Sequence, residues 1–330
     1  MLSAQPGVEQ NIRTEFEQHP VSQYFEFKEF ISLDKPGLLI GELSDVFITA
    51  NGLIIGDRKS DAILYLDKVK NRVQLLSVEE IQPGHHFRLK AFTAIDSNRY
   101  IIASDPHQYF IFDGPKVVES FALHEFFTPH TMTCFRDTLY LFTQPGPGKA
   151  EVFVVPLAEK TSHSFELQDY APDLSRLVFR NKSNKCFLVD TSGWLYITSG
   201  YENKIYRYDH TGNLTDLVII NKNRFNTIKD TNANTPFSPS GTRQPHDFLF
   251  SVFLVQDRWF LSTFSDDKKI YTDLLTTTGQ SLFPHPLPLW RPIRAVHGTD
   301  IYFEQPHREI DGKIKNPGLV VCRLKREVLN

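Results

Sequence analysis

Short runs of apolar residues, separated by polar turns, follow one another along most of this chain. The clearest example is residues 185–220, which read KCFLVDTSGWLYITSGYENKIYRYDHTGNLTDLVII. Its turns, TSG, SGYEN and HTGN, contain the glycine and asparagine that short hairpin turns need for positive φ. Because these runs are short and lack a helical period, the stretch is predicted to form four consecutive antiparallel strands.

The same arrangement of strands recurs, so that the chain holds six copies of it. The other five copies cover residues 45–76, 91–121, 131–167, 247–283 and 291–325. An apolar or aromatic residue marks the second strand of each copy: Ile54, Tyr100, Tyr140, Tyr196, Phe260 and Tyr302. These markers lie roughly 50 residues apart, a period typical of propeller repeats. Only residues 7–18, GVEQNIRTEFEQ, are predicted to form a helix.

A single four-stranded sheet would leave both faces and both edges uncovered, so the copies are predicted to stack into a ring. The last copy lacks an outer strand, while residues 23–33, QYFEFKEFISL, have strand character and precede the first copy. We therefore predict an all-β fold: a six-bladed β-propeller of four-stranded antiparallel blades, closed by the N-terminal strand. Residues 1–22 would form an extension and residues 23–330 the propeller. A pair of β-sandwich domains is the alternative.

Composition supports a globular β protein and excludes some partners. Hydrophobic residues make up 41% and charged residues 23% of the chain, and 27 Phe and 12 Tyr favour pleated surfaces. A net charge of −3 argues against nucleic-acid binding, and no apolar run reaches the roughly 20 residues of a membrane span.

The start of the sequence carries no recognisable signal peptide, which predicts a cytoplasmic protein, or an extracytoplasmic one if a signal has been removed. We also expect a monomer. The three cysteines, Cys134, Cys186 and Cys322, fall in different copies and are predicted to be free thiols.

Two stretches resemble a known superfamily. Residues 193–218, GWLYITSGYENKIYRYDHTGNLTDLV, resemble an NHL-type repeat in the order of strand, turn, YRYD and TGN. Residues 25–67 are similar to six-bladed propeller proteins common in gut-type bacteria. The chain thus resembles the six-bladed β-propeller superfamily that includes NHL-type and TolB-like repeats. No WD dipeptide and no kelch double glycine recurs.

Six histidines are expected on one face of such a ring, and proline precedes four of them. His85, His86, His130 and His246 lie just before the first strand of a copy, whereas His107 and His307 lie between the second and third strands. Proline fixes φ and disfavours helix in the residue before it, so the chain enters each strand extended and the histidine is held in place.

The first group can be a metal site, an acid–base site or neither. His86, His130 and His246 come from different copies and are predicted to converge, which would suit a divalent metal such as zinc. Without a metal, His130 and His246 could act as general acid and base near neutral pH. The resemblance extends to propeller peptidyl-hydroxyglycine lyases, whose metal-binding histidines precede inner strands. This chain is similar in that placement at His130 and His246, and also at His85 or His86. The other copies carry Glu42, the stretch FRNKSN (residues 179–184), or Arg291 and Arg294 there. Ordinary turn chemistry, without any function, is the alternative.

Three arginines extend the predicted site towards a substrate. Arg243, Arg291 and Arg294 could bind an anionic substrate through paired hydrogen bonds, and Arg243 ends a long connection, residues 221–243. The predicted catalytic residues are His130, His246, Arg243 and Arg294, surrounded by His85, His107, His307, Glu42 and Arg291. The sequence therefore predicts a lyase, hydrolase or isomerase for a small polar or anionic substrate. The alternative is a propeller that binds a ligand or a protein without catalysis.

Overall fold

The structure is a computed structural model of the whole chain. It describes residues 6–35, 37–57, 59–60, 62–70, 72–76, 89–104, 107–123, 131–146, 149–168, 187–198, 203–220, 249–266, 269–310 and 312–329. Each of the six predicted copies contributes strands to one four-stranded antiparallel sheet, and we number these six sheets as blades 1–6. The chain divides into two compact units, residues 1–122 with 289–330, and residues 123–288.

The first unit contains blades 1, 2 and 6. Blade 1 consists of β2 (Leu43–Ile48), β3 (Gly52–Asp57), β4 (Ala62–Asp67) and β5 (Arg72–Leu76), and blade 2 of β6 (Leu89–Ala94), β7 (Arg99–Ser104), β8 (Gln108–Asp113) and β9 (Lys116–Ala122). Blade 6 consists of β22 (Ile293–His297), β23 (Asp300–Gln305), β26 (Gly318–Leu324) and β1 (Phe25–Ser32). A two-stranded hairpin, β24 (Arg308–Ile310) and β25 (Lys313–Lys315), interrupts this last blade.

The second unit contains blades 3, 4 and 5. Blade 3 consists of β10 (Thr131–Phe135), β11 (Thr138–Gly146), β12 (Lys149–Pro156) and β13 (His163–Glu166). Blade 4 consists of β14 (Phe187–Val189), β15 (Leu195–Thr198), β16 (Lys204–Tyr208) and β17 (Leu214–Ile219). Blade 5 consists of β18 (Leu249–Val255), β19 (Trp259–Asp266), β20 (Lys269–Thr276) and β21 (Leu287–Pro288).

Blade 4 shows why the turn residues predicted its meander correctly. Gly193, in the turn before β15, and Gly212, in the turn before β17, both have φ of +88°, a conformation that side chains with a Cβ rarely adopt. A Cβ at Gly212 would also lie 2.6 Å from the ring of Phe165 in blade 3. Glycine at this turn therefore permits both the turn itself and the close packing of two neighbouring blades.

The N-terminal segment completes blade 6, as predicted. β1 pairs antiparallel with β26, with Phe30 opposite Val320 and Ser32 opposite Gly318. The strands approach closely at Gly318, where a Cβ would lie 2.5 Å from the Phe30 ring and 2.9 Å from the carbonyl oxygen of Ile31. The first strand of the chain therefore covers an edge that β26 would otherwise expose.

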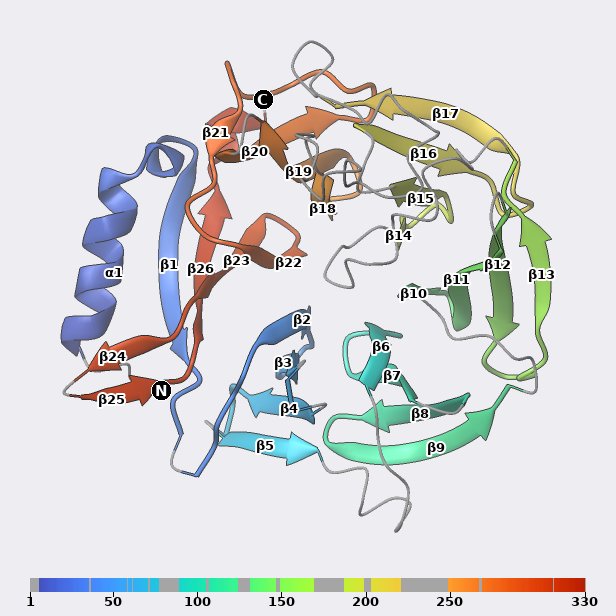
Figure 1. Cartoon of the computed structure of the whole chain (residues 1–330), viewed down its shortest axis with the longest axis horizontal. Helices are drawn as coiled ribbons and strands as arrows, with labels where there is room; N and C mark the ends of the chain where they lie inside the picture. The colour runs from blue at the N-terminus through green and yellow to red at the C-terminus, as the bar shows by residue number, and fades with distance from the viewer. Residues whose placement is uncertain are drawn as a thin grey trace, which may run out of the picture. The chain divides into compact units, whose positions relative to one another are not determined.

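The predicted helix is also present and packs on blade 6. α1 (Pro6–Gln18) lies alongside β1 (Figure 1) and is followed by the 3₁₀ helix η1 (Pro20–Gln23). The buried ring of Phe16 meets Phe27 of β1 at 5.9 Å and Trp290 at 5.2 Å between centroids, both edge to face. A second 3₁₀ helix, η3 (Arg326–Val328), follows β26.

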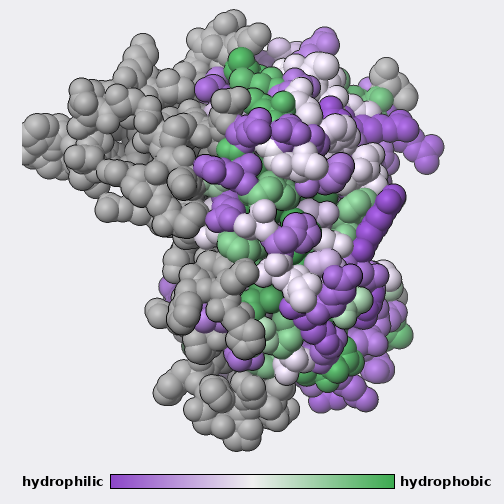
Figure 2. Space-filling view, turned by 90° about the vertical axis from the view of Figure 1, so that its right-hand side faces the viewer, coloured by the Kyte–Doolittle hydropathy of each residue, from purple (hydrophilic) through white to green (hydrophobic). Residues whose placement is uncertain are grey.

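Apolar side chains between adjacent blades form the cores of the two units. In the first unit, Leu53 and Leu64 of blade 1 pack in one cluster with Tyr302 of blade 6. In the second unit, separate clusters join blade 3 to blade 4 and blade 4 to blade 5. Hydrophilic side chains, with isolated apolar ones between them, cover much of the described surface visible in Figure 2.

Two observations bear on the remaining predictions about the chain as a whole. Cys134 is a half-buried free thiol and Cys322 a buried one, as predicted, whereas Cys186 lies outside the described residues. Among the residues that the structure describes, no helix is both long and apolar enough to cross a membrane.

Candidate functional site

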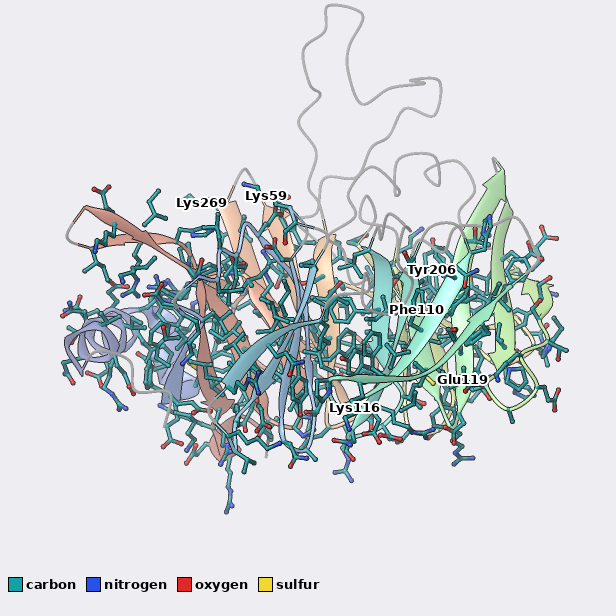
Figure 3. All side chains as sticks on the ribbon, turned by 90° about the horizontal axis from the view of Figure 1, so that it is seen from below. Lys59, Phe110, Lys116, Glu119, Tyr206 and Lys269 are labelled. Carbon is teal, nitrogen blue, oxygen red and sulfur yellow. The ribbon has the colours of Figure 1, made fainter. Side chains whose placement is uncertain are left out.

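The predicted site residues of the first unit lie at one end of its blades. In an antiparallel meander, the start of the first strand and the turn between the second and third strands lie at the same end. We call this the Lys59 end, because Lys59 lies in the β3–β4 turn. Figure 3 shows Lys59 at one end of the strands and Lys116, at the start of β9, at the other. The described candidates at the Lys59 end are Glu42, Arg291, Arg294, His107 and His307.

Asp57 fixes the backbone at the start of blade 1. Its buried carboxylate, at the end of β3, accepts hydrogen bonds from the backbone N–H groups of Gly41 (2.8 Å) and Glu42 (3.0 Å). The carboxylate also accepts from the Lys59 N–H at 3.1 Å and from the Ser60 hydroxyl at 2.7 Å. Burial alone would raise the pKa of Asp57, but these four donors outweigh burial and hold its pKa below the ordinary value. Glu42 is therefore fixed at its backbone.

Arg294 lies at the start of β22 and is held by an ion pair. Its Nε donates to Oε2 of Glu304 in β23 at 2.6 Å, and its Nη2 lies 2.5 Å from the same oxygen. The two side chains are only 16% and 13% exposed. The third nitrogen, Nη1, reaches towards the carbonyl oxygen of Ser44 in β2 at 3.5 Å. The guanidinium is thus held between two neighbouring first strands, β2 and β22, and cannot swing freely.

Arg291 is turned towards the N-terminal helix. Its Nη1 donates to Oε1 of Gln305, and its Nη2 forms an ion pair with Glu15 of α1. The guanidinium carbon also lies 4.5 Å from the centre of the Trp290 ring. Burial lowers the pKa of Arg291, an effect that the charge of Glu15 opposes. These contacts show Arg291 fastening α1 to blade 6.

His307 bridges two segments of backbone. Its Nδ1 lies 3.1 Å from the carbonyl oxygen of Lys315, and its Nε2 lies 3.1 Å from the carbonyl oxygen of Gly41. Both partners can only accept hydrogen bonds, so the imidazole satisfies both at once only when both nitrogens carry a proton. Nearby, the Asn316 amide donates to the carbonyl oxygen of Leu38 at 2.8 Å. The hairpin of blade 6 is thus fastened to the segment that leads into blade 1.

Of the other predicted site residues, the structure describes only one, His107. His107 is half-buried in the β7–β8 turn and has φ of +58°, in the left-handed region. His85, His86, His130, His246 and Arg243 lie outside the described residues. Among the side chains that are described, no group of three or more His, Cys, Asp or Glu is arranged to hold a metal ion. The zinc site therefore stays a prediction.

The sequence analysis did not identify Asp57 and Glu304, the residues that hold Glu42 and Arg294 in place. Asp57 precedes the turn residues of GDRKSDA, and aspartate before such a turn is a known local signal, because its carboxylate can bind the backbone a few residues on. Glu304 carries no comparable signal. It meets Arg294 only because β22 and β23 are paired, which places side chains ten residues apart on one face of the sheet.

Comparisons with known proteins agree with this architecture. No protein-family model matches the sequence, and no curated protein sequence matches it either. A Bacteroides fragilis protein described as exported has a similar structure, with a TM-score of 0.63 and 12% identity over 93% of this chain and 97% of that one. A member of the DUF4221 family from Bacteroides vulgatus has a TM-score of 0.59 and 8% identity, over 91% and 97% of the two chains.

An enzyme is also among the similar structures. A catalytically inactive variant of virginiamycin B lyase from Staphylococcus aureus, with quinupristin, has a TM-score of 0.53 and 11% identity, covering 90% of this chain and 99% of that one. The fold is a six-bladed β-propeller. The predicted fold class, with four-stranded antiparallel blades, is thereby confirmed. At such low identities these structures establish the propeller fold alone, since function depends on the site and not on the fold.

Proposed function

We propose that this propeller is an enzyme, a lyase, hydrolase or isomerase, that acts on a small polar or anionic substrate at the Lys59 end. The observation that carries the proposal is Arg294. A half-buried guanidinium at the start of a blade's first strand, held by Glu304, is a fixed positive charge that can orient an anionic group. First strands surround the central channel of a propeller, so a substrate at the channel mouth would meet Arg294.

The chemistry in this proposal belongs to His130 and His246, with Arg243 as a second cation. They precede the first strands of blades 3 and 5, whereas Arg294 is the second residue of the first strand of blade 6. In one version the two histidines act as general acid and base. In the other, His86 joins them to hold a divalent metal such as zinc, which would supply a Lewis acid. The remaining candidates, His85, His107, His307, Glu42 and Arg291, would surround or position this group.

A second function, binding without catalysis, is favoured by a different observation. Three of the predicted polar groups already have partners within the protein: Arg291 binds Glu15, Arg294 binds Glu304, and His307 binds two carbonyl oxygens. Groups held this firmly form a rigid surface with little spare capacity for proton transfer. A preformed propeller face of this kind could bind a peptide, a glycan or a protein without further chemistry.

Metal analysis of untagged protein distinguishes the metal-dependent version of the proposed enzyme from the metal-free acid–base version. If a metal is held, elemental analysis should find about one zinc per chain in the wild type, and His130→Ala and His246→Ala should lose it while keeping their circular dichroism spectra. His210→Ala is the matched control, because His210 is exposed in the β16–β17 turn. It should keep the metal.

Turnover decides between catalysis and binding. Quinupristin, present in the Staphylococcus aureus structure, is a suitable first compound in a panel of small anionic and cyclic substrates followed by mass spectrometry. Conversion by the wild type and His210→Ala, but not by His246→Ala or Arg294→Gln, would support the enzyme. Binding of a compound without conversion, unaffected by His246→Ala, would support the second function.

A further inference from the structure

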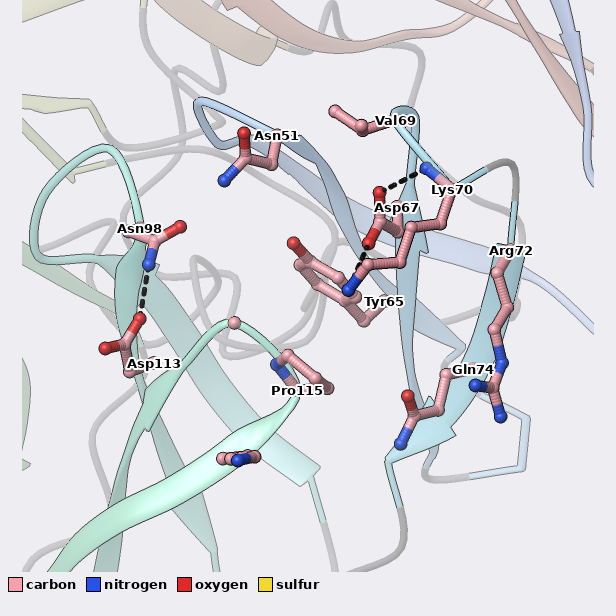
Figure 4. Close-up of a pocket in the computed structure, with 12 residues that line it drawn as sticks. Asn51, Tyr65, Asp67, Val69, Lys70, Arg72, Gln74, Asn98, Asp113 and Pro115 are labelled. Carbon is pink, nitrogen blue, oxygen red and sulfur yellow. Dashed lines mark hydrogen bonds and ion pairs between the residues drawn. The ribbon is translucent and has the colours of Figure 1, made fainter. Parts of the chain in front are cut away.

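A pocket of about 460 Å³ lies between blades 1 and 2 at the Lys116 end, away from the candidate site. Four turns supply its walls: β2–β3 and β4–β5 of blade 1, and β6–β7 and β8–β9 of blade 2. Its volume is in the usual range for small-molecule sites. Tyr65, buried at its base, lies between the Asp67–Lys70 pair of blade 1 and the Asn98–Asp113 pair of blade 2 (Figure 4).

Backbone hydrogen bonds join the four turns into one frame. The N–H of Ala50 donates to the carbonyl of Ser97 at 2.5 Å, which links the first turns of the two blades. Within blade 1, the Lys68 N–H donates to the carbonyl of Asn51 at 2.8 Å. Within blade 2, the Gly114 N–H donates to the carbonyl of Asn98 at 3.1 Å. The pocket is therefore held open by main-chain contacts and does not need a ligand to form.

The two carboxylates of the pocket are already occupied by donors. Asp67 accepts from the Lys70 N–H at 2.8 Å, and the Lys70 ammonium lies 3.6 Å from its second oxygen. Asp113 accepts from the Asn98 side-chain amide. Each carboxylate keeps some lone pairs for a further weak donor, which suits a ligand hydroxyl better than a second full positive charge.

Two cations form the outer wall of the pocket. Arg72, at the start of β5, and Lys116, at the start of β9, are exposed, and neither forms an ion pair with another residue in the described part of the chain. Arg72 lies directly opposite Asp67 and Lys116 directly opposite Asp113 on the neighbouring strands. Together with Lys70, these cations outnumber the two carboxylates of the pocket by one, so an anionic group would be attracted. Burial raises the pKa of Tyr65, so its hydroxyl stays protonated and can donate.

We propose that this pocket binds a small sugar that carries one anionic group, either a carboxylate or a phosphate. The anion would face Arg72 and Lys116, and the ring hydroxyls would donate to Asp67 and Asp113 and accept from Asn51, Asn98 and Tyr65. Hydroxyls both donate and accept, so a sugar can use the amides and the occupied carboxylates together. A zwitterionic amino acid fits less well, because its ammonium would need a carboxylate without a partner.

Gly114 gives a way to close the pocket without disturbing its frame. This buried residue has φ of +54°, and a Cβ there would have only the Tyr65 hydroxyl within 4 Å, at 3.9 Å. Asparagine tolerates the left-handed region better than most residues. The side chain of Gly114→Asn would therefore enter the pocket in front of Tyr65 and exclude a ligand.

Isothermal titration of the full chain with glucuronate, glucose 6-phosphate, glucose and alanine tests the proposal. At least one of the two anionic sugars should bind, and the tighter of them identifies the anion. Glucose should bind at least about tenfold more weakly, the effect of one lost charge-assisted contact.

The variants Arg72→Gln and Lys116→Gln should each weaken binding of the anionic sugar by a similar factor, and Gly114→Asn should abolish its binding with little change in melting temperature. Arg326→Gln and Lys313→Gln, which remove exposed charges elsewhere in the first unit, are the matched controls and should bind as the wild type does.

Three results with the sugars and the charge variants would overturn this assignment. They are no binding of either anionic sugar, glucose binding as tightly as the anionic sugars, or equal weakening in the control variants. Tighter binding of alanine would also overturn it, in favour of an amino-acid site. None of these results bears on His246 or Arg294, so this proposal and the proposed enzyme can fail separately.

Discussion

Phe25, at the start of the first strand, pairs directly with Leu324, at the end of the last strand of blade 6. The two side chains are 1% and 2% exposed. Their pairing means that the outer edge of blade 6 is supplied by the opposite end of the chain. Blade 6 is thus closed by a non-local contact, which must survive for the sheet to stay whole.

Removal of residues 1–34 should unfold the first unit. The deletion removes β1 and with it the buried side chains of Phe25, Phe27, Ile31 and Leu33. Each fully buried apolar side chain contributes about 1.5–3 kcal/mol, so their sum approaches the 5–15 kcal/mol of a typical domain. The freed edge of β26 would also invite aggregation. Thermal unfolding followed by circular dichroism should show a loss of the cooperative transition.

Removal of residues 1–5 alone is the control for that deletion, because it leaves α1 and β1 intact. It should melt as the wild type does. If the longer truncation melts at the same temperature as well, β1 does not close blade 6 in solution.

Removing one partner of the Arg294–Glu304 pair should lower the free energy of unfolding more than replacing both partners does. Arg294→Met leaves the half-buried carboxylate of Glu304 without its partner, and Glu304→Leu leaves the guanidinium. Because the pair is partly exposed, each single change should cost roughly 1–3 kcal/mol, below the range for fully buried pairs. The double variant should lose less free energy of unfolding than the sum of the losses in the two single variants. Urea unfolding of the four proteins measures this coupling. Additive losses would mean that the pair contributes little to holding β22.

The strands were predictable because their signals are local. Gly193 and Gly212 mark turns that require positive φ, and an aromatic or aliphatic residue recurs in the second strand of each copy. The pairing of residues 25–32 with the end of the chain followed from counting strands in the last copy. Local turn chemistry and one missing strand were therefore enough to predict the fold.

The site was less predictable, because the partners of its charged groups are distant in sequence. Arg291 was assigned to a substrate, yet its partner is Glu15, in a helix at the other end of the chain. His307 was assigned to the same face, yet it binds two carbonyl oxygens that only the folded hairpin brings near. The pocket at the Lys116 end is built from four separate turns, none of which carries a binding motif of its own.

Asp57→Asn should destabilise the protein in a pH-dependent way. An amide oxygen can replace only some of the hydrogen bonds that the carboxylate accepts from Gly41, Glu42, Lys59 and Ser60, so the loss at pH 7 should be roughly 2–4 kcal/mol. The pKa of Asp57 is lower in the folded state than in the unfolded one. Its contribution is therefore fully present above the unfolded pKa of about 4 and is lost as the pH falls through the folded value.

Urea unfolding at several pH values tests this dependence on Asp57. The difference between wild type and Asp57→Asn should shrink steadily as the pH falls from 5 towards 2. Glu327→Gln, an exposed substitution, should show only a small difference throughout. A gap between wild type and Asp57→Asn that does not change with pH would mean that the carboxylate's charge has no part in holding the Gly41–Glu42 backbone.

Asp273 of β20 should show the opposite pH dependence. It is 2% exposed, and burial raises its pKa to about 6, although a hydrogen bond from the Ser281 hydroxyl at 2.6 Å partly opposes this. Because the folded pKa lies above the unfolded one, the protein loses stability as the pH rises from the unfolded pKa of about 4 to the folded value of about 6, and the loss stays constant above that pH. The rise in the pKa of Asp273 from 3.8 to about 6 corresponds to roughly 3 kcal/mol. Asp273→Asn cannot ionise, so its free energy of unfolding relative to wild type should rise by about this much between pH 4 and pH 8.

The comparison at pH 4 measures any cost of the buried amide itself, and Asp216→Asn, on the exposed side of β17, serves as the control. An equal difference between wild type and Asp273→Asn at both pH values would show that Asp273 ionises as freely in the folded protein as in the unfolded chain.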